Sequence, residues 1–174
     1  MRSDITALSR LRTRWRGETA SNSDFMNKAF VKEQDSTEGR CPRCGSPGSV
    51  VYHETLRAHL PDEALEHLTE SAFFCGQPRC PVVYFDLFDR TVEESAVKTP
   101  VYPKDPVAPL CACFGLTRED IEEDIREGTV ARTRACIERA KSPEARCATA
   151  SPSGQSCIAE VQRYYMKMRA ETSG

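Results

Sequence analysis

The chain has 174 residues and a mass of 19.5 kDa, enough for one ordinary domain or two small ones. Its formal net charge of -2 and its pI of about 6.0 argue against a nucleic-acid binder, which usually has a basic surface. No stretch approaches the roughly 18 apolar residues of a membrane span, so we expect no membrane insertion. The first residues, 1–17, lack the apolar segment of a secretory signal, and we therefore predict a cytoplasmic protein with reduced thiols.

The composition along the chain predicts four segments and an α+β fold. Residues 1–39 are polar without sustained periodicity, and we predict a disordered tail. Residues 40–90 contain short apolar runs and paired cysteines, which predict a small zinc-ribbon-like β lobe that binds zinc. Residues 91–110 contain four regularly spaced prolines and are predicted to be a semi-rigid connector. Residues 111–169 show helical patterns and are predicted to form a second, helical lobe.

The predicted zinc-binding lobe contains strands and one helix. Residues 49–53 are β-prone, and residues 61–70 have apolar side chains at helical spacing after a proline suited to a helix start. Residues 72–75 and 81–85 are apolar runs around a Gly/Pro loop, which predicts two strands. In the connector, residues 101–102 are predicted to be a short strand.

Helix-capping signals mark the second lobe. Thr117 and Asp120 resemble a capping box, and Gly128 suits the residue that follows a helix end. A second helix is predicted from Thr129 to about Lys141, where a Ser-Pro pair stops it, and a third from about Ser156 onward.

The nine cysteines of the chain include a first set of four with the spacing of a zinc site. Cys41 and Cys44 form a C-x-x-C turn followed by glycine, and Cys75 and Cys80 are separated by four residues. Four thiolates with no open position make a tetrahedral structural zinc site. The sequence therefore predicts that these four cysteines bind Zn²⁺.

Three histidines, His53, His59 and His67, lie between the two cysteine pairs. One of them could replace a cysteine as a ligand, because imidazole also binds zinc. Each also has a place on a β-prone or helical segment, and we favour surface positions for them.

A second set comprises Cys111, Cys113, Cys147 and Cys157. The C-x-C spacing is too short for an ordinary zinc-ribbon turn, and four cysteine thiolates, two on each iron, hold a [2Fe–2S] cluster. Cys157 follows a loop of small residues at the start of a predicted helix, whose dipole would stabilise negative charge. Cys136 competes for membership, but its mid-helix position favours a small buried thiol.

These motifs together resemble the CopZ-type copper chaperone family. The resemblance covers Cys41-Pro-Arg-Cys44-Gly45, Phe74-Cys75 through Phe85, Cys111-Ala-Cys113-Phe114-Gly115 and Pro152-Ser153-Gly154 through Cys157. The second part is similar to the fold of bacterioferritin-associated ferredoxin. The resemblance implies zinc at the first set and a [2Fe–2S] cluster at the second, which would supply an electron for reducing Cu(II). A copper-binding domain with a Met-x-Cys-x-x-Cys motif normally follows in that family, and this chain, which ends at Gly174, lacks the motif.

We therefore predict a zinc- and [2Fe–2S]-containing protein that supplies electrons in copper or other heavy-metal homeostasis. Its expected partners are a separate copper or heavy-metal chaperone or transporter and a redox donor. The alternative is a structural zinc-ribbon adaptor without a redox role. An enzyme with a catalytic thiol is not expected, because each candidate nucleophile is better explained as a metal ligand.

Overall fold

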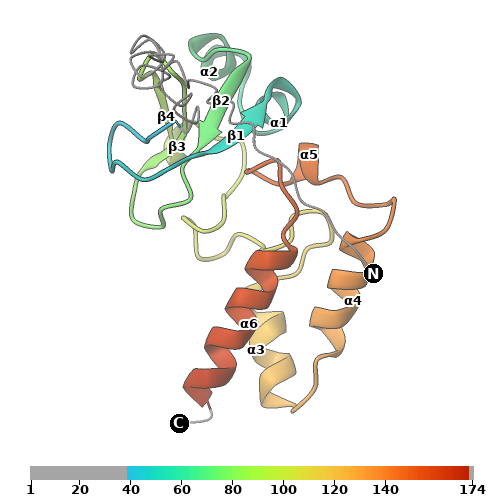
Figure 1. Ribbon diagram of the computed structural model, residues 1–174. Helices are drawn as coiled ribbons and strands as arrows, with labels where there is room; N and C mark the ends of the chain where they lie inside the picture. The colour runs from blue at the N-terminus through green and yellow to red at the C-terminus, as the bar shows by residue number, and fades with distance from the viewer. Residues whose placement is uncertain (1–38, 173–174) are drawn as a thin grey trace, which may run out of the picture. The chain divides into compact units, whose positions relative to one another are not determined.

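The computed structural model describes residues 39–172, so the predicted tail, 1–39, lies outside the described residues except for Gly39. The described residues fall within one unit of the chain. They form a mixed α/β fold with a four-stranded antiparallel sheet and six α-helices, as Figure 1 shows. Among these helices, none combines the length and the apolar character needed to cross a bilayer.

The sheet is a simple meander in which each strand pairs with the next along the chain. Its strands are β1 (Ser49–Tyr52), β2 (Ser71–Phe74), β3 (Val82–Phe85) and β4 (Thr91–Glu93). β2 and β3 were predicted from their apolar runs, and all four residues of β3 are buried. Buried strands read as continuous apolar runs because both of their faces are covered.

Two short helices connect β1 and β2. α1 (His53–His59) follows β1 directly and was not predicted, since no turn residue separates the strand from the helix. α2 (Asp62–His67) is shorter than the predicted helix 61–70, because Leu68 has an extended backbone and ends it. Leu56 and Leu60 are fully buried and anchor this helical connection on the sheet's apolar core.

A buried carboxylate organises the turn between β3 and β4. The carboxylate of Asp86 accepts hydrogen bonds from the backbone N–H groups of Phe88 and Arg90 and pairs with the Arg90 guanidinium at 2.6 Å. These bonds turn the chain back onto β3, so β4 lies in the segment predicted as a connector. The predicted strand at residues 101–102 was wrong, because Val101 is buried in the core without pairing to a strand.

After β4, the short 3₁₀-helix η1 (Glu94–Ala96) and a segment of turns lead to the helical part of the described chain. Its helices are α3 (Arg118–Arg126), α4 (Ala131–Ala140), α5 (Cys147–Ala150) and α6 (Ile158–Thr172). The capping box predicted for α3 is present, since Thr117 and Asp120 bond each other's backbone N–H groups. α3, α4 and α6 pack against one another, whereas the one-turn α5 was not predicted.

The sheet and the helical part are joined by side-chain hydrogen bonds from buried residues. The Thr55 hydroxyl donates to the carbonyl of Ala148 at 2.6 Å, and the Tyr84 hydroxyl donates to the carbonyl of Pro152 at 2.9 Å. α1 accordingly lies beside α5 (Figure 1). These contacts fix the loop that carries α5 and leads into α6.

Candidate metal centres

The first two cysteines of the first set lie on a tight turn that precedes β1. The backbone N–H of Gly45 donates to the carbonyl of Cys41 at 2.7 Å, and the N–H of Cys41 donates to the carbonyl of Ser46 at 2.9 Å. Gly45 has a φ of 71°, which a residue with a side chain adopts only at a cost. The turn therefore directs the thiols of Cys41 and Cys44 toward one point.

The other two cysteines bracket the loop between β2 and β3. The N–H of Cys75 donates to the carbonyl of Val83 at 2.9 Å, and the N–H of Cys80 donates to the carbonyl of Gln77 at 3.1 Å. The loop is thus closed by the sheet at one end and by its own turn at the other.

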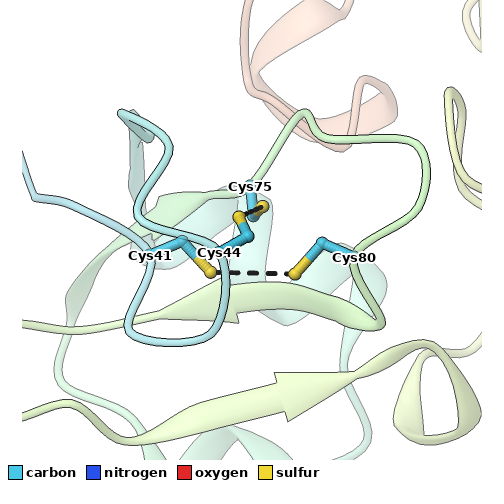
Figure 2. A group of neighbouring side chains, drawn as sticks. All are labelled: Cys41, Cys44, Cys75 and Cys80. Atoms are coloured by element: carbon cyan, nitrogen blue, oxygen red, sulfur yellow. Dashed lines mark hydrogen bonds between the residues drawn. The ribbon is translucent and has the colours of Figure 1, made fainter.

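Figure 2 shows the four side chains converging between the turn and this loop. The Sγ atoms of Cys41 and Cys80 are 3.8 Å apart, and those of Cys44 and Cys75 are 3.7 Å apart. All four Sγ atoms lie within 4.8 Å of one another. A tetrahedron with metal–sulfur bonds of about 2.3 Å has edges of about 3.8 Å, so the arrangement fits a four-thiolate zinc ion.

The burial of this quartet fits a structural site. Cys41, Cys75 and Cys80 are buried, and Cys44 is exposed. With four sulfur ligands the ion has no open position for a substrate. None of the three histidines belongs to the group.

The pKa values of Cys75 and Cys44 in the quartet are shifted in opposite directions. Burial raises the pKa of the Cys75 thiol to about 12. For Cys44, desolvation also raises the pKa, but hydrogen bonds from the backbone and hydroxyl of Ser46 outweigh it and lower the pKa to about 6. A metal ion bound at this site would therefore displace a proton from Cys75, and the lowered pKa of Cys44 favours its thiolate.

Lys104 supports the loop of the quartet and was not identified from the sequence. Its side chain is nine-tenths buried, and its ammonium group donates to the carbonyls of Gln77 and Cys80 at 3.0 and 2.8 Å. A positive charge at this position also offsets the net negative charge of four thiolates around a divalent ion. No local pattern marks this lysine, which lies in the proline-rich segment after the sheet.

Replacing Lys104 by methionine is expected to weaken zinc binding by about tenfold, because groups that orient the ligands contribute on this scale. Competition with a chromophoric chelator at fixed pH measures the change. Lys98→Met is the matched control, since Lys98 is exposed and its ammonium group donates to the carbonyl of Arg57, outside the loop. Equal zinc affinities of the two variants would contradict this role of Lys104.

The second set begins on a turn that repeats the hydrogen bonding of the first. The N–H of Gly115 donates to the carbonyl of Cys111 at 2.8 Å, and the N–H of Cys111 donates to the carbonyl of Leu116 at 3.2 Å. Gly115 has a φ of 70°, as Gly45 does in the first turn. In the first turn, Cys44 is the fourth residue counted from Cys41. In this turn, Cys113 is the third residue counted from Cys111, so the two cysteines are one residue closer in the chain.

The structure divides the thiols of this region into a pair and a trio. The Sγ atoms of Cys113 and Cys147 are 3.9 Å apart, and both residues are half-buried. The Sγ atoms of Cys111, Cys136 and Cys157 lie within 4.8 Å of one another, and all three residues are buried. The structure thus adds Cys136 to the neighbourhood of the predicted set.

Cys136 was predicted to be a small buried thiol, and it is buried in the apolar cluster around Ile121 and Val161. Its sulfur also belongs to the trio, which agrees with the alternative that Cys136 competes for membership of the second set. The cysteine lies on α4 at helical spacing from the buried Thr133 and Ala140, which is the pattern of any core residue. Only the packing of α4 against α3 and α6 brings it to Cys111 and Cys157.

The trio strongly perturbs the protonation of its members. Hydrogen bonds from Cys136 and Cys157 lower the pKa of Cys111 to about 3. The pKa of Cys136 is raised to about 11, mainly by Cys111, while the charge of Arg139 lowers it. The Arg139 guanidinium lies 4.1 Å from the centre of the Phe114 ring, next to Cys113 in the chain. Thiols whose pKa is lowered by their neighbours lose their protons more readily, which favours binding of a soft metal.

The donor chemistry of this region fits a thiolate-bound iron–sulfur cluster. Five cysteine sulfurs are available, where a [2Fe–2S] cluster needs four. The apolar residues packed around Cys111, Cys136 and Cys157 limit the access of water to these thiols. The five cysteines of this region lie on the Cys111 turn, on α4, on α5 and directly before α6, and four of them would hold the cluster.

Comparison with known proteins gives matches at two levels. Residues 38–98 match the family zf_CopZ, described as a zinc binding domain, and this range contains the whole first quartet. The X-ray structure of the Archaeoglobus fulgidus CopZ N-terminal domain is similar over 72% of this chain and 96% of that chain, with 26% sequence identity and a TM-score of 0.62. The comparison with curated proteins found no match. The structural similarity extends beyond residues 38–98, because it covers a larger share of the chain.

Proposed function

This chain carries a CopZ-type N-terminal region, and on that premise we propose that it is a metal-handling redox protein with a structural zinc and a [2Fe–2S] cluster. When bound, such a cluster takes up and releases one electron at a time. The protein would supply electrons in copper or other heavy-metal homeostasis, in the cytoplasm. It would act as an electron-transfer component and not as an enzyme in its own right.

The observation that carries this proposal is the second thiol region, which is separate from the zinc quartet. The quartet uses Cys41, Cys44, Cys75 and Cys80 and leaves no open position. The five other cysteines belong to a different region with a different spacing, in which Cys111, Cys136 and Cys157 lie among buried apolar side chains and Cys113 and Cys147 are half-buried. A second structural ion would not need this surplus of thiols, whereas a two-iron cluster uses four of them.

The proposed partners follow from this role. A redox donor would reduce the cluster, and a separate copper or heavy-metal chaperone or transporter would receive the electron or the metal. We propose no nucleic-acid partner, since the chain is slightly acidic, and no membrane insertion. We also propose that the helical part has a fold similar to that of bacterioferritin-associated ferredoxin.

The alternative function is a structural zinc adaptor without redox activity. It is favoured by one observation, that Cys111, Cys136 and Cys157 alone form a group of soft ligands able to hold a single ion. In that case the protein would be colourless and would contain about two zinc ions per chain.

Metal analysis of the protein purified without oxygen separates the two functions. We expect about one zinc, two iron and two acid-labile sulfide ions per chain. Reduction with dithionite should produce an electron paramagnetic resonance signal that the oxidised protein lacks. Cys113→Ala should remove iron and sulfide and leave zinc bound, because Cys113 belongs to the pair and not to the quartet. A colourless protein without sulfide would contradict the proposed redox function.

A further inference from the structure

The second region has five thiols, one more than the four cysteine positions of a [2Fe–2S] cluster. The extra thiol belongs to the trio of Cys111, Cys136 and Cys157 and not to the pair. Cys113 and Cys147 form an isolated pair at 3.9 Å, close to the tetrahedral edge of about 3.8 Å for two thiolates on one metal ion. Each iron of such a cluster takes two cysteines. The pair therefore supplies one iron, and three thiols are left for the two positions on the other.

The three remaining thiols come from three different elements, each held by its own contacts. Cys111 is fixed by its turn, Cys157 directly precedes α6, and Cys136 lies within α4. The backbone N–H of Val161 donates to the carbonyl of Cys157 at 2.9 Å, which ties that residue to the first turn of α6. Removing the side chain of one member therefore leaves the other two sulfurs in place.

α4 holds Cys136 against the other two thiols without support from either of them. Its N-terminus is fixed by Asp124 of α3, whose carboxylate accepts hydrogen bonds from the backbone N–H and the hydroxyl of Thr133 at 2.8 Å each. The helix packs on α3 and α6, beside which it lies in Figure 1. A rigid element that presents a ligand in this way keeps it ready for use.

We propose that Cys136 is a reserve ligand: any two of Cys111, Cys136 and Cys157 can hold the buried side of the cluster, whereas Cys113 and Cys147 cannot be replaced. This inference rests on the proposed function. The exchange transfers no electrons, since the Cys136 thiol releases its proton to solvent as its sulfur takes the vacated position. A purely packing role for Cys136 gives the opposite expectation, that the loss of Cys111 or Cys157 alone removes the cluster.

Alanine variants of the full chain, purified without oxygen, distinguish these roles. Alanine is preferred to serine, because a serine oxygen could itself bind iron. Cys111→Ala and Cys157→Ala should each retain most of the wild-type iron and sulfide, with shifted visible absorption and paramagnetic resonance spectra. Combining either change with Cys136→Ala should remove nearly all iron and sulfide. Cys136→Ala alone should have wild-type metal content and spectra.

Cys113→Ala and Cys147→Ala are the matched controls, and each should lose the cluster although Cys136 is intact. Zinc content and circular dichroism verify that every variant is folded. If Cys111→Ala and Cys157→Ala lose as much iron and sulfide as the double variants, or if Cys136→Ala alone loses the cluster, the reserve role is wrong. A wild-type chain without sulfide would instead overturn the proposed function itself, and the reserve role with it.

Discussion

Cys75→Ser is expected to unfold the sheet and the turn that carries Cys41 and Cys44, with the loss of bound zinc. Cys75 is fully buried, follows β2 directly, and its Sγ lies 3.7 Å from that of Cys44. A structural zinc contributes on the order of 10 kcal/mol to the folding of small metal-dependent domains. This is comparable to the total stability of about 5–15 kcal/mol of a typical domain, so we expect the remaining contacts not to offset a lost ligand.

The apolar residues around the quartet explain why the sheet depends on it. Phe73, Val82 and Phe85 form one buried cluster with the thiols of Cys41, Cys75 and Cys80, and the rings of Phe73 and Phe85 stack at 5.3 Å. A Cβ on Gly48 would lie 2.6 Å from the Phe85 ring, so the turn and the sheet approach each other as closely as the backbone allows. Without zinc the turn would lose its main link to the loop between β2 and β3.

Zinc content, far-ultraviolet circular dichroism and thermal unfolding measure this effect, and treatment of the wild-type chain with a chelator should reproduce it. Cys136→Ala is the matched control, because it removes a buried thiol outside the quartet. The control should keep its zinc and its β signal. A Cys75→Ser protein with bound zinc and the unfolding temperature of the wild type would contradict the structural role of the quartet.

Local chemistry made part of the fold predictable. The capping residues Thr117 and Asp120 and the glycine at position 128 act within one or two turns of α3, so the predicted and observed bounds nearly coincide. The apolar runs of β2 and β3 were recognisable for the same reason, since a strand buried on both faces needs no distant partner to show its pattern.

Elements that depend on tertiary contacts were missed or misplaced. β4 has three residues, too few for a periodic pattern, and exists because the buried Asp86 turns the chain back onto β3. Val101 resembles a strand residue, but its burial satisfies the apolar side chain without any strand pairing. A sequence pattern reports which side chains avoid water and does not distinguish these two ways of burying them.

In the candidate sites too, local spacing predicts some features, whereas tertiary packing determines others. The spacing of the first four cysteines encodes two turns that face each other, and the structure brings all four together. In the second region the spacing indicated Cys111, Cys113, Cys147 and Cys157, and the structure divides these between the pair and the trio. The position of Cys136 in the trio depends on how α4 packs, which no local spacing encodes.

The packing of α4 depends in turn on Asp124, and Asp124→Asn is expected to destabilise the helical part by about 3–5 kcal/mol. The side chain of Asp124 is fully buried, and it accepts hydrogen bonds from the backbone N–H groups of Arg132 and Thr133. These are the second and third residues of α4, whose own preceding residue, Val130, provides no cap. An asparagine would turn an N–H₂ group toward donors that now meet a carboxylate oxygen.

The pH dependence of stability gives this prediction a second test. Burial alone would raise the pKa of Asp124, but hydrogen bonds from Thr133 and Arg132 outweigh it and hold the pKa below its ordinary value. The carboxylate therefore stabilises the fold above the unfolded pKa of about 3.9, and this contribution is lost as the pH falls through the lower folded value. The stability difference between wild type and Asp124→Asn should be largest near neutral pH and should shrink in acid.

Asp120→Asn is the matched control, because it alters a partly exposed carboxylate in the capping box of α3, where we expect a cost of about 1 kcal/mol. Urea unfolding followed by circular dichroism at several pH values compares the variants. Zinc content should stay unchanged in both, since the quartet lies among the residues of the sheet. Equal stabilities of the two variants at neutral pH would show that α4 keeps its position without the buried carboxylate, and the independent support for Cys136 would then be lost.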